Sequence, residues 1–118
     1  MRRMALAAVA VSICGNVFAA RTLEPIESAY ELRLIHVVWP ASTLGSLIVK
    51  PCPECDEVTL FVDGETTYSV VGQAPITLTD FAVVAGQLRA SQGEEASVGV
   101  FYEPKSKRVT RVVLYPAG

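Results

Sequence analysis

Hydrophobic and polar residues alternate in short runs along most of the chain, which is the period-two pattern of β-strands packed on one face. The runs are rich in β-branched and aromatic residues and are bounded by proline, glycine or charged residues. The expected strands cover residues 30–38, 46–50, 57–62, 66–71, 98–102 and 108–115. About six short strands at this spacing predict a small β-rich fold.

The segments between these strands predict hairpins. Asp63-Gly64 lies between strands 57–62 and 66–71, and glycine accepts the positive φ that a tight hairpin turn requires. The polar segment 103–107 connects the last two strands in the same way. These connections predict a mainly antiparallel sheet.

The first strand, 30–38, is expected to be continuous. Its alternating residues share one face of the sheet. These residues are Tyr30, Leu32, Leu34, His36 and Val38. Trp39-Pro40 ends the run, because proline cannot donate a hydrogen bond to a neighbouring strand.

One helix is expected between the fourth and fifth strands. Its apolar residues recur at i, i+3, i+4 and i+7, namely Phe81, Val84, Ala85 and Leu88. Thr77 or Thr79 can cap its start, Asp80 suits the positive end of the helix dipole, and Gly93 follows its exit. The order β-β-β-β-α-β-β predicts an α+β fold with the helix packed on a face of the sheet.

Residues 1–19 have the pattern of a cleavable secretory signal peptide. Two arginines precede an apolar stretch over 4–13, which is shorter than the roughly twenty residues that a membrane-spanning helix needs. Val17 and Ala19 occupy positions −3 and −1, so cleavage is expected after Ala19. We expect a single domain, 20–118, in the periplasm or outside the cell, with no stable membrane span after cleavage.

Two other interpretations of the first segment fit less well. An uncleaved anchor would have to stretch the apolar run over residues 4–20. A lipoprotein would carry its lipid on Cys14, but Ile13 stands where such signals have a small residue.

Charge and composition narrow the function classes. Eight basic and twelve acidic residues remain after cleavage, a net charge of −4, without the basic surface of nucleic-acid-binding proteins. The basic cluster Lys105, Lys107 and Arg108 lies in a predicted turn, where charge is normally solvated. No nucleophile elbow accompanies the single histidine, His36, and nothing indicates a cofactor. The sequence favours a protein that is not an enzyme.

Cys52 and Cys55 are the cysteines that remain after cleavage. In an oxidising compartment, two thiols three positions apart usually form a disulfide. The bridge would pin the bend between strands 46–50 and 57–62 and so stabilise the fold. We expect this structural disulfide.

Two other roles for the pair stay open. Cys-Pro-Glu-Cys resembles the Cys-Pro-x-Cys of glutaredoxin-like thiol oxidoreductases, which implies disulfide exchange with Cys52 as nucleophile and Cys55 as resolving thiol. In that family the nucleophile opens a helix, whereas a strand pattern and acidic neighbours surround this pair, and acidic neighbours raise a thiol pKa. A zinc site would need His36 and a carboxylate as further ligands.

Aromatic residues give the last candidate site. Trp39, Tyr68 and Tyr102 lie in or beside predicted strands, where core packing is the ordinary role and a ligand-binding aromatic face is the alternative. Together these features predict a non-catalytic binding or accessory module of the cell envelope, stabilised by a Cys52–Cys55 disulfide, with an unidentified protein or envelope partner.

Overall fold

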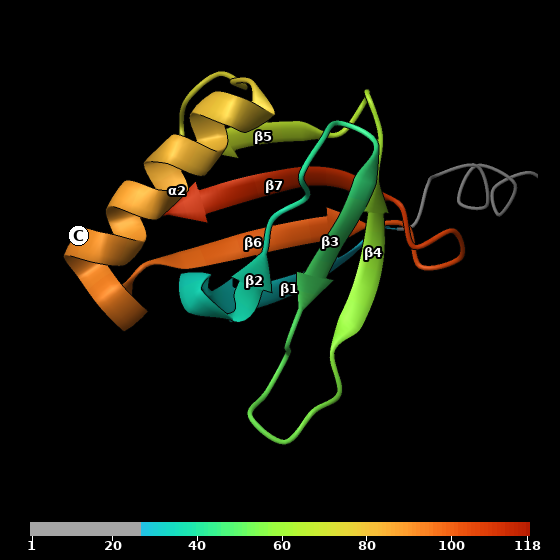
Figure 1. Ribbon diagram of the computed structural model, residues 1–118, viewed down its shortest axis with the longest axis horizontal. Coiled ribbons are helices and arrows are strands. Elements are labelled where there is room, and N and C mark those ends of the chain that lie inside the picture. The colour runs from blue at the N-terminus through green and yellow to red at the C-terminus, as the bar shows by residue number, and fades with distance from the viewer. Residues whose placement is uncertain (1–26) are drawn as a thin grey trace, which may run out of the picture.

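The computed structural model describes residues 27–118, which form two β-sheets and one α-helix (Figure 1). The strands are β1 (Ser28–Arg33), β2 (Val37–Val38), β3 (Gly45–Val49), β4 (Val58–Val62), β5 (Thr67–Val70), β6 (Ser97–Tyr102) and β7 (Val109–Tyr115). The helix α2 spans Leu78–Gln92, and two 3-10 helices are η2 (Leu34–His36) and η3 (Gly93–Glu95). The expected α+β class is confirmed. The expected signal peptide, 1–19, and Cys14 lie outside the described residues.

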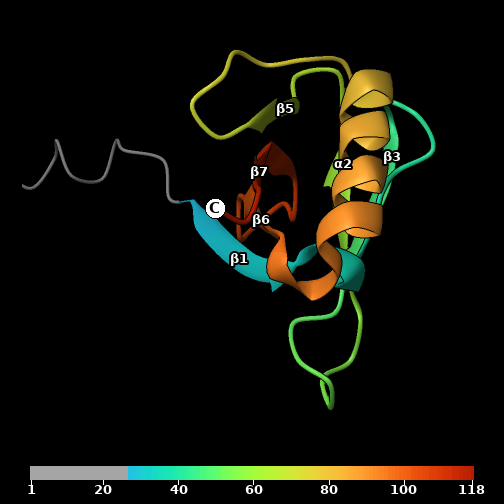
Figure 2. The same cartoon turned by 90° about the vertical axis from the view of Figure 1, so that its left-hand side faces the viewer.

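The two sheets enclose the core. The four-stranded sheet has the order β1-β6-β7-β5, and the three-stranded sheet has the order β2-β3-β4. Both α2 and the three-stranded sheet lie on the same side of the four-stranded sheet (Figures 1 and 2). Fully buried aliphatic side chains face each other across this space, among them Leu47, Val49, Leu60, Val98, Val100, Val112 and Leu114. Their alternation along each strand is the pattern seen in the sequence.

The helix forms where the apolar spacing predicts it. The Thr77 hydroxyl accepts a hydrogen bond from the Asp80 N–H at 3.1 Å, which caps the first turn. Gly93 ends the helix at φ 58°, a left-handed conformation that glycine adopts without steric cost. Phe81 and Ala85 are buried beneath the helix. The sequence prediction is confirmed for both ends and for the buried face.

The continuous first strand is a wrong prediction, because the chain leaves the sheet after Arg33. It turns through η2 and pairs again as β2 in the other sheet, so residues 27–118 form seven strands where six were expected. The Leu34 N–H still donates to the Ala96 carbonyl at 3.1 Å. Arg89 of α2 donates to the carbonyls of Leu34 and Val37, at 2.9 and 3.1 Å. A distant side chain therefore satisfies carbonyl groups that the break leaves without ladder partners.

The prediction of a hairpin at Asp63-Gly64 is also wrong, although the chain does turn there. The Thr66 N–H donates to the Asp63 carbonyl at 3.1 Å, but β4 and β5 belong to different sheets. β5 pairs instead with β7, in parallel. The buried Thr66 hydroxyl donates to the Val109 carbonyl at 2.7 Å, which ties the crossing to β7. The last predicted hairpin, β6 with β7, is confirmed.

Arg108 connects the turn between β4 and β5 to the loop between β6 and β7. Its Nε donates to the Asp63 carboxylate at 2.7 Å, and its other nitrogens lie 3.3 Å from Glu65 and 3.5 Å from Glu103. The hydrogen bond from Arg108, with a second from the Glu65 N–H, lowers the pKa of Asp63 below its ordinary 3.8. Asp63 is therefore more acidic in the folded state than in the unfolded chain.

Asp63→Asn is expected to flatten the acid limb of the stability curve. Because the folded pKa is depressed, the Asp63 charge stabilises the fold above its unfolded pKa, and this stabilisation is lost as pH falls through the folded pKa. Urea unfolding between about pH 6 and pH 2 measures the effect as a shallower decline in the variant than in the wild type. Identical declines would contradict the role assigned to the Asp63–Arg108 pair.

Candidate functional site

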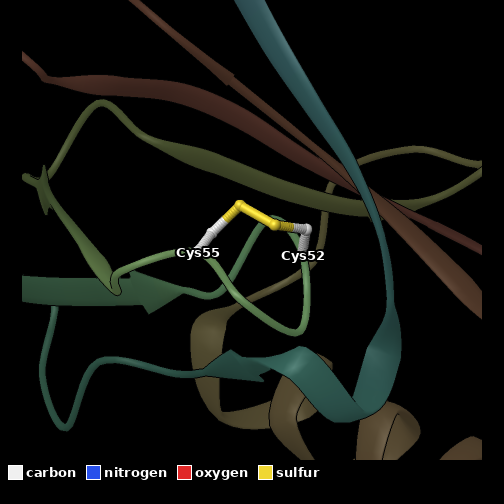
Figure 3. Close-up of a disulfide and its surroundings, with 2 residues drawn as sticks. All are labelled: Cys52 and Cys55. Carbon is white, nitrogen blue, oxygen red and sulfur yellow. A yellow bond between two sulfur atoms is a disulfide. The ribbon is translucent and has the colours of Figure 1, made fainter.

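The cysteine pair lies in a turn between β3 and β4. The Cys55 N–H donates to the Cys52 carbonyl at 3.1 Å, and the two Cα atoms are 5.0 Å apart. Figure 3 shows the two sulfur atoms bonded across the turn. The next element is a strand, β4, so the pair does not stand at the start of a helix. This turn lacks the helix dipole that lowers the pKa of the attacking thiol in Cys-Pro-x-Cys oxidoreductases.

A groove of about 490 Å³ lies between this turn and the end of β1. One wall comes from the disulfide turn and the other from β1, and η2 and η3 contribute one lining residue each. The lining residues are Glu31, Leu32, Arg33, His36, Pro51, Cys52, Pro53 and Glu94. The groove therefore combines aliphatic, proline and disulfide surface with the polar side chains of Glu31, Arg33, His36 and Glu94.

Of the charged side chains at the groove, two form an ion pair with each other and one carboxylate has no ion-pair partner among the described residues. Arg33 forms an ion pair with Glu94 at 2.5 Å, and both side chains are exposed. Glu31 forms no ion pair with any residue in the part of the chain that the structure describes. The site therefore offers one carboxylate whose charge is not neutralised by the protein itself.

The backbone of β1 adds unpaired hydrogen-bonding groups beside the groove. β1 is an edge strand, paired only with β6. The Leu34 N–H points toward β6, where it donates to Ala96, and in an antiparallel ladder every second residue points the other way. The backbone groups of Ala29, Glu31 and Arg33 therefore face away from the sheet. Within residues 27–118 they make no backbone hydrogen bond on that side.

The three predicted aromatic site residues do not gather at this groove. Trp39 packs edge-on against Phe81 with ring centroids 5.1 Å apart, and Tyr68 packs on the same ring at 5.2 Å. Tyr102 instead stacks on Tyr30 at 5.1 Å. Tyr68 is only 4 % exposed, so its ring belongs to the core. The structure gives these side chains packing partners and no common binding face.

Tyr68→Phe is expected to leave the fold intact and to stabilise it by about 1 kcal/mol, because an unpaired buried hydroxyl is removed. Among the described residues, the Tyr68 hydroxyl is buried without a hydrogen-bond partner, and burial raises its pKa to about 12. The remaining ring keeps its contact with Phe81. Urea denaturation of the variant measures the change, and a clear loss of stability would reveal a partner for the hydroxyl.

The residues considered for a metal site come only partly together. Cys52 and His36 line the same groove, but both cysteine sulfurs are engaged in the disulfide. Across residues 27–118, no group of three or more His, Cys, Asp or Glu is placed to hold a metal ion. No helix in the same range is long and apolar enough to cross a membrane.

The sequence singled out Cys52 but missed most of the groove. Arg33 and Glu94 are 61 positions apart, and no local pattern connects them. In the first predicted strand, Glu31 and Arg33 fall on the face opposite Tyr30 and Leu32, which is a second local signal for this site. No protein-family model, curated protein or solved structure matches this chain, so its function has to be inferred from the geometry of the groove.

Proposed function

We propose that the protein is an exported, non-catalytic binding module of the cell envelope, in which the Cys52–Cys55 disulfide shapes one wall of the binding groove. The observation that carries this proposal is the position of the disulfide turn, which lines a groove opposite an unpaired strand edge. The signal-peptide pattern of residues 1–19 supports export. The disulfide agrees with this location, because a pair of nearby cysteines oxidises readily outside the cytoplasm.

The local chemistry of the turn supports a rigid wall. Pro51 and Pro53 restrict the backbone on both sides of Cys52, because the proline ring limits φ. A wall that is already ordered loses little conformational entropy when a ligand binds. The strand that follows the pair and the acidic residues beside it favour this structural role over disulfide exchange.

Site-specific photo-crosslinking in the native host tests the proposal. The full chain carries a photo-crosslinking amino acid in place of Pro53, which is exposed at the groove, or in place of Lys105 as a matched control. Lys105 lies in the loop at the opposite end of β6 from η3. We expect processed protein that begins at Ala20, and a discrete adduct in the envelope fraction from position 53 that is absent from position 105.

The alternative function gives a different result. A disulfide-exchange protein carrying Cys55→Ala would accumulate mixed disulfides through Cys52, because the resolving thiol is missing. We expect none above the background of an unrelated exposed cysteine. Trapped mixed disulfides, the same adducts from both crosslinking positions, or unprocessed protein in the cytoplasm would contradict the binding module.

A further inference from the structure

We infer that the free edge of β1 binds an extended peptide segment of alternating basic and apolar residues, which adds to the sheet as a further strand. This inference rests on the proposed function and names the chemistry of its ligand. It is carried by the unpaired backbone of β1, the unneutralised charge of Glu31 and the groove beside them.

The open edge itself points to an extended ligand. A strand edge presents a row of backbone donors and acceptors that an added strand can satisfy. The other edge strands of the described sheets are partly occupied. The Ile76 N–H donates to the Tyr68 carbonyl of β5 at 2.8 Å, and the Phe61 N–H of β4 donates to the Lys107 carbonyl at 2.9 Å. The third edge, β2, has only two residues, and Arg89 donates to its Val37 carbonyl. Within residues 27–118, the outward groups of β1 have no such backbone partner. β1 is therefore the edge best prepared for strand addition.

The side chains around β1 set the preferred residues of the ligand. Successive side chains of an added strand point to opposite faces of the sheet. On the face of Glu31, a basic side chain finds a carboxylate without an ion pair, whereas Arg33 is already neutralised by Glu94. On the other face lies the buried Leu32, and the partly exposed Pro51 and Cys52 line the groove together with Glu31, so an apolar residue is favoured there. The geometry thus favours a basic residue beside Glu31 and apolar residues at the positions on either side of it.

The disulfide turn favours a single peptide over a second copy of the chain. The turn lines the groove on the side opposite β1. Two-fold pairing of β1 with β1 of a second copy would bring two such turns to one edge, together with both flanking sheets. A single extended segment requires only the groove and the edge. A second copy of the chain is therefore the competing outcome of the test.

Titration of the oxidised protein with a defined peptide tests the inference. The probe is acetyl-Thr-Lys-Val-Lys-Val-Lys-Thr-amide, followed by amide chemical shifts and hydrogen exchange. One matched control carries N-methyl groups on the lysine amides, which removes backbone donors and keeps every side chain. A second control replaces Lys by Glu. We expect shifts and slower exchange at Ala29, Glu31 and Arg33, at least about tenfold weaker binding after N-methylation, and roughly two- to fivefold weaker binding with Glu.

Two substitutions of Glu31 separate backbone pairing from charge. Glu31→Thr removes the carboxylate and keeps the N–H, whereas Glu31→Pro removes both. Proline is tolerated on an edge strand where the N–H faces away from the sheet, and thermal unfolding of both variants checks that the fold is retained. We expect the proline variant to bind the peptide about three- to tenfold more weakly than the threonine variant.

Each remaining outcome would overturn strand addition. These outcomes are no binding at about 1 mM peptide, equal binding of the N-methylated peptide, equal binding by the two Glu31 variants, and shifts confined to a surface away from β1. A dimer that protects the same amides without peptide would replace the ligand by a second copy. If the peptide fails while crosslinking from position 53 succeeds, the proposed function stands and strand addition does not. If both fail, the proposed function falls as well.

Discussion

Phe81→Ala is expected to lower the free energy of unfolding by about 3–5 kcal/mol, the largest effect of any substitution considered for this protein. The Phe81 ring has no exposed surface, and it contacts Trp39 and Tyr68 at centroid distances of 5.1 and 5.2 Å. These partners come from the end of β2 and from β5, so the ring joins α2 to both sheets. Truncation removes this joint contact and leaves a cavity that the surrounding strands cannot fill.

Urea denaturation of Phe81→Ala measures the loss, and Val83→Ala is the matched control. Val83 lies on the same helix but is 55 % exposed, so its truncation is expected to change stability by about 0.5 kcal/mol or less. A Phe81→Ala variant whose stability matched that of the control would show that α2 is not packed through this ring.

Replacement of both Cys52 and Cys55 by alanine is expected to lower the free energy of unfolding by about 2 kcal/mol and the Tm by roughly 8–16 °C. The disulfide closes a short loop, so it restricts the unfolded chain only modestly. The effect on a fold of this size is still large, because small chains have thin stability margins.

Calorimetry under non-oxidising conditions compares this variant with the reduced wild type. Both should melt at the same temperature, below the oxidised wild type, because each lacks the same constraint. An unchanged Tm on removal of the pair would contradict a structural disulfide. A melting temperature of the alanine variant far below that of the reduced wild type would mean that the thiols contribute through packing instead.

Local patterns predicted those elements whose determinants lie close together in the sequence. The helix follows from Thr77, Asp80 and the spacing of Phe81 and Ala85, all within three turns. The hairpin of β6 and β7 likewise depends on alternation and a short polar loop. In both cases the residues that determine the element also contact one another, so one sequence was enough.

Distant partners determined what the sequence could not predict. The break after Arg33 depends on Arg89, which lies 55 positions beyond Leu34 and donates to its carbonyl. The crossing after Asp63 depends on Val109, whose carbonyl accepts from the Thr66 hydroxyl 43 positions away. Alternation alone is the same whether a strand continues in its sheet or passes to another.

The candidate site illustrates the same division. The cysteine pair was recognisable because its spacing is local, and the structure bonds the two sulfur atoms. The groove could not be recognised from the sequence, because its walls come from β1, η3 and the disulfide turn, which are brought together only in the folded chain. A sequence can thus indicate a chemical group without indicating the surface that it helps to form.

The reduction potential of the Cys52–Cys55 pair tests most directly whether the disulfide is a structural part of the groove or takes part in thiol–disulfide exchange. Equilibration of the folded protein with glutathione or dithiothreitol buffers measures it. A pair that precedes a strand, among acidic residues, has no local group that stabilises a thiolate, so we predict a potential below about −300 mV. A potential between about −270 and −120 mV, the range of thiol oxidoreductases, would contradict a structural disulfide and assign the pair to exchange chemistry.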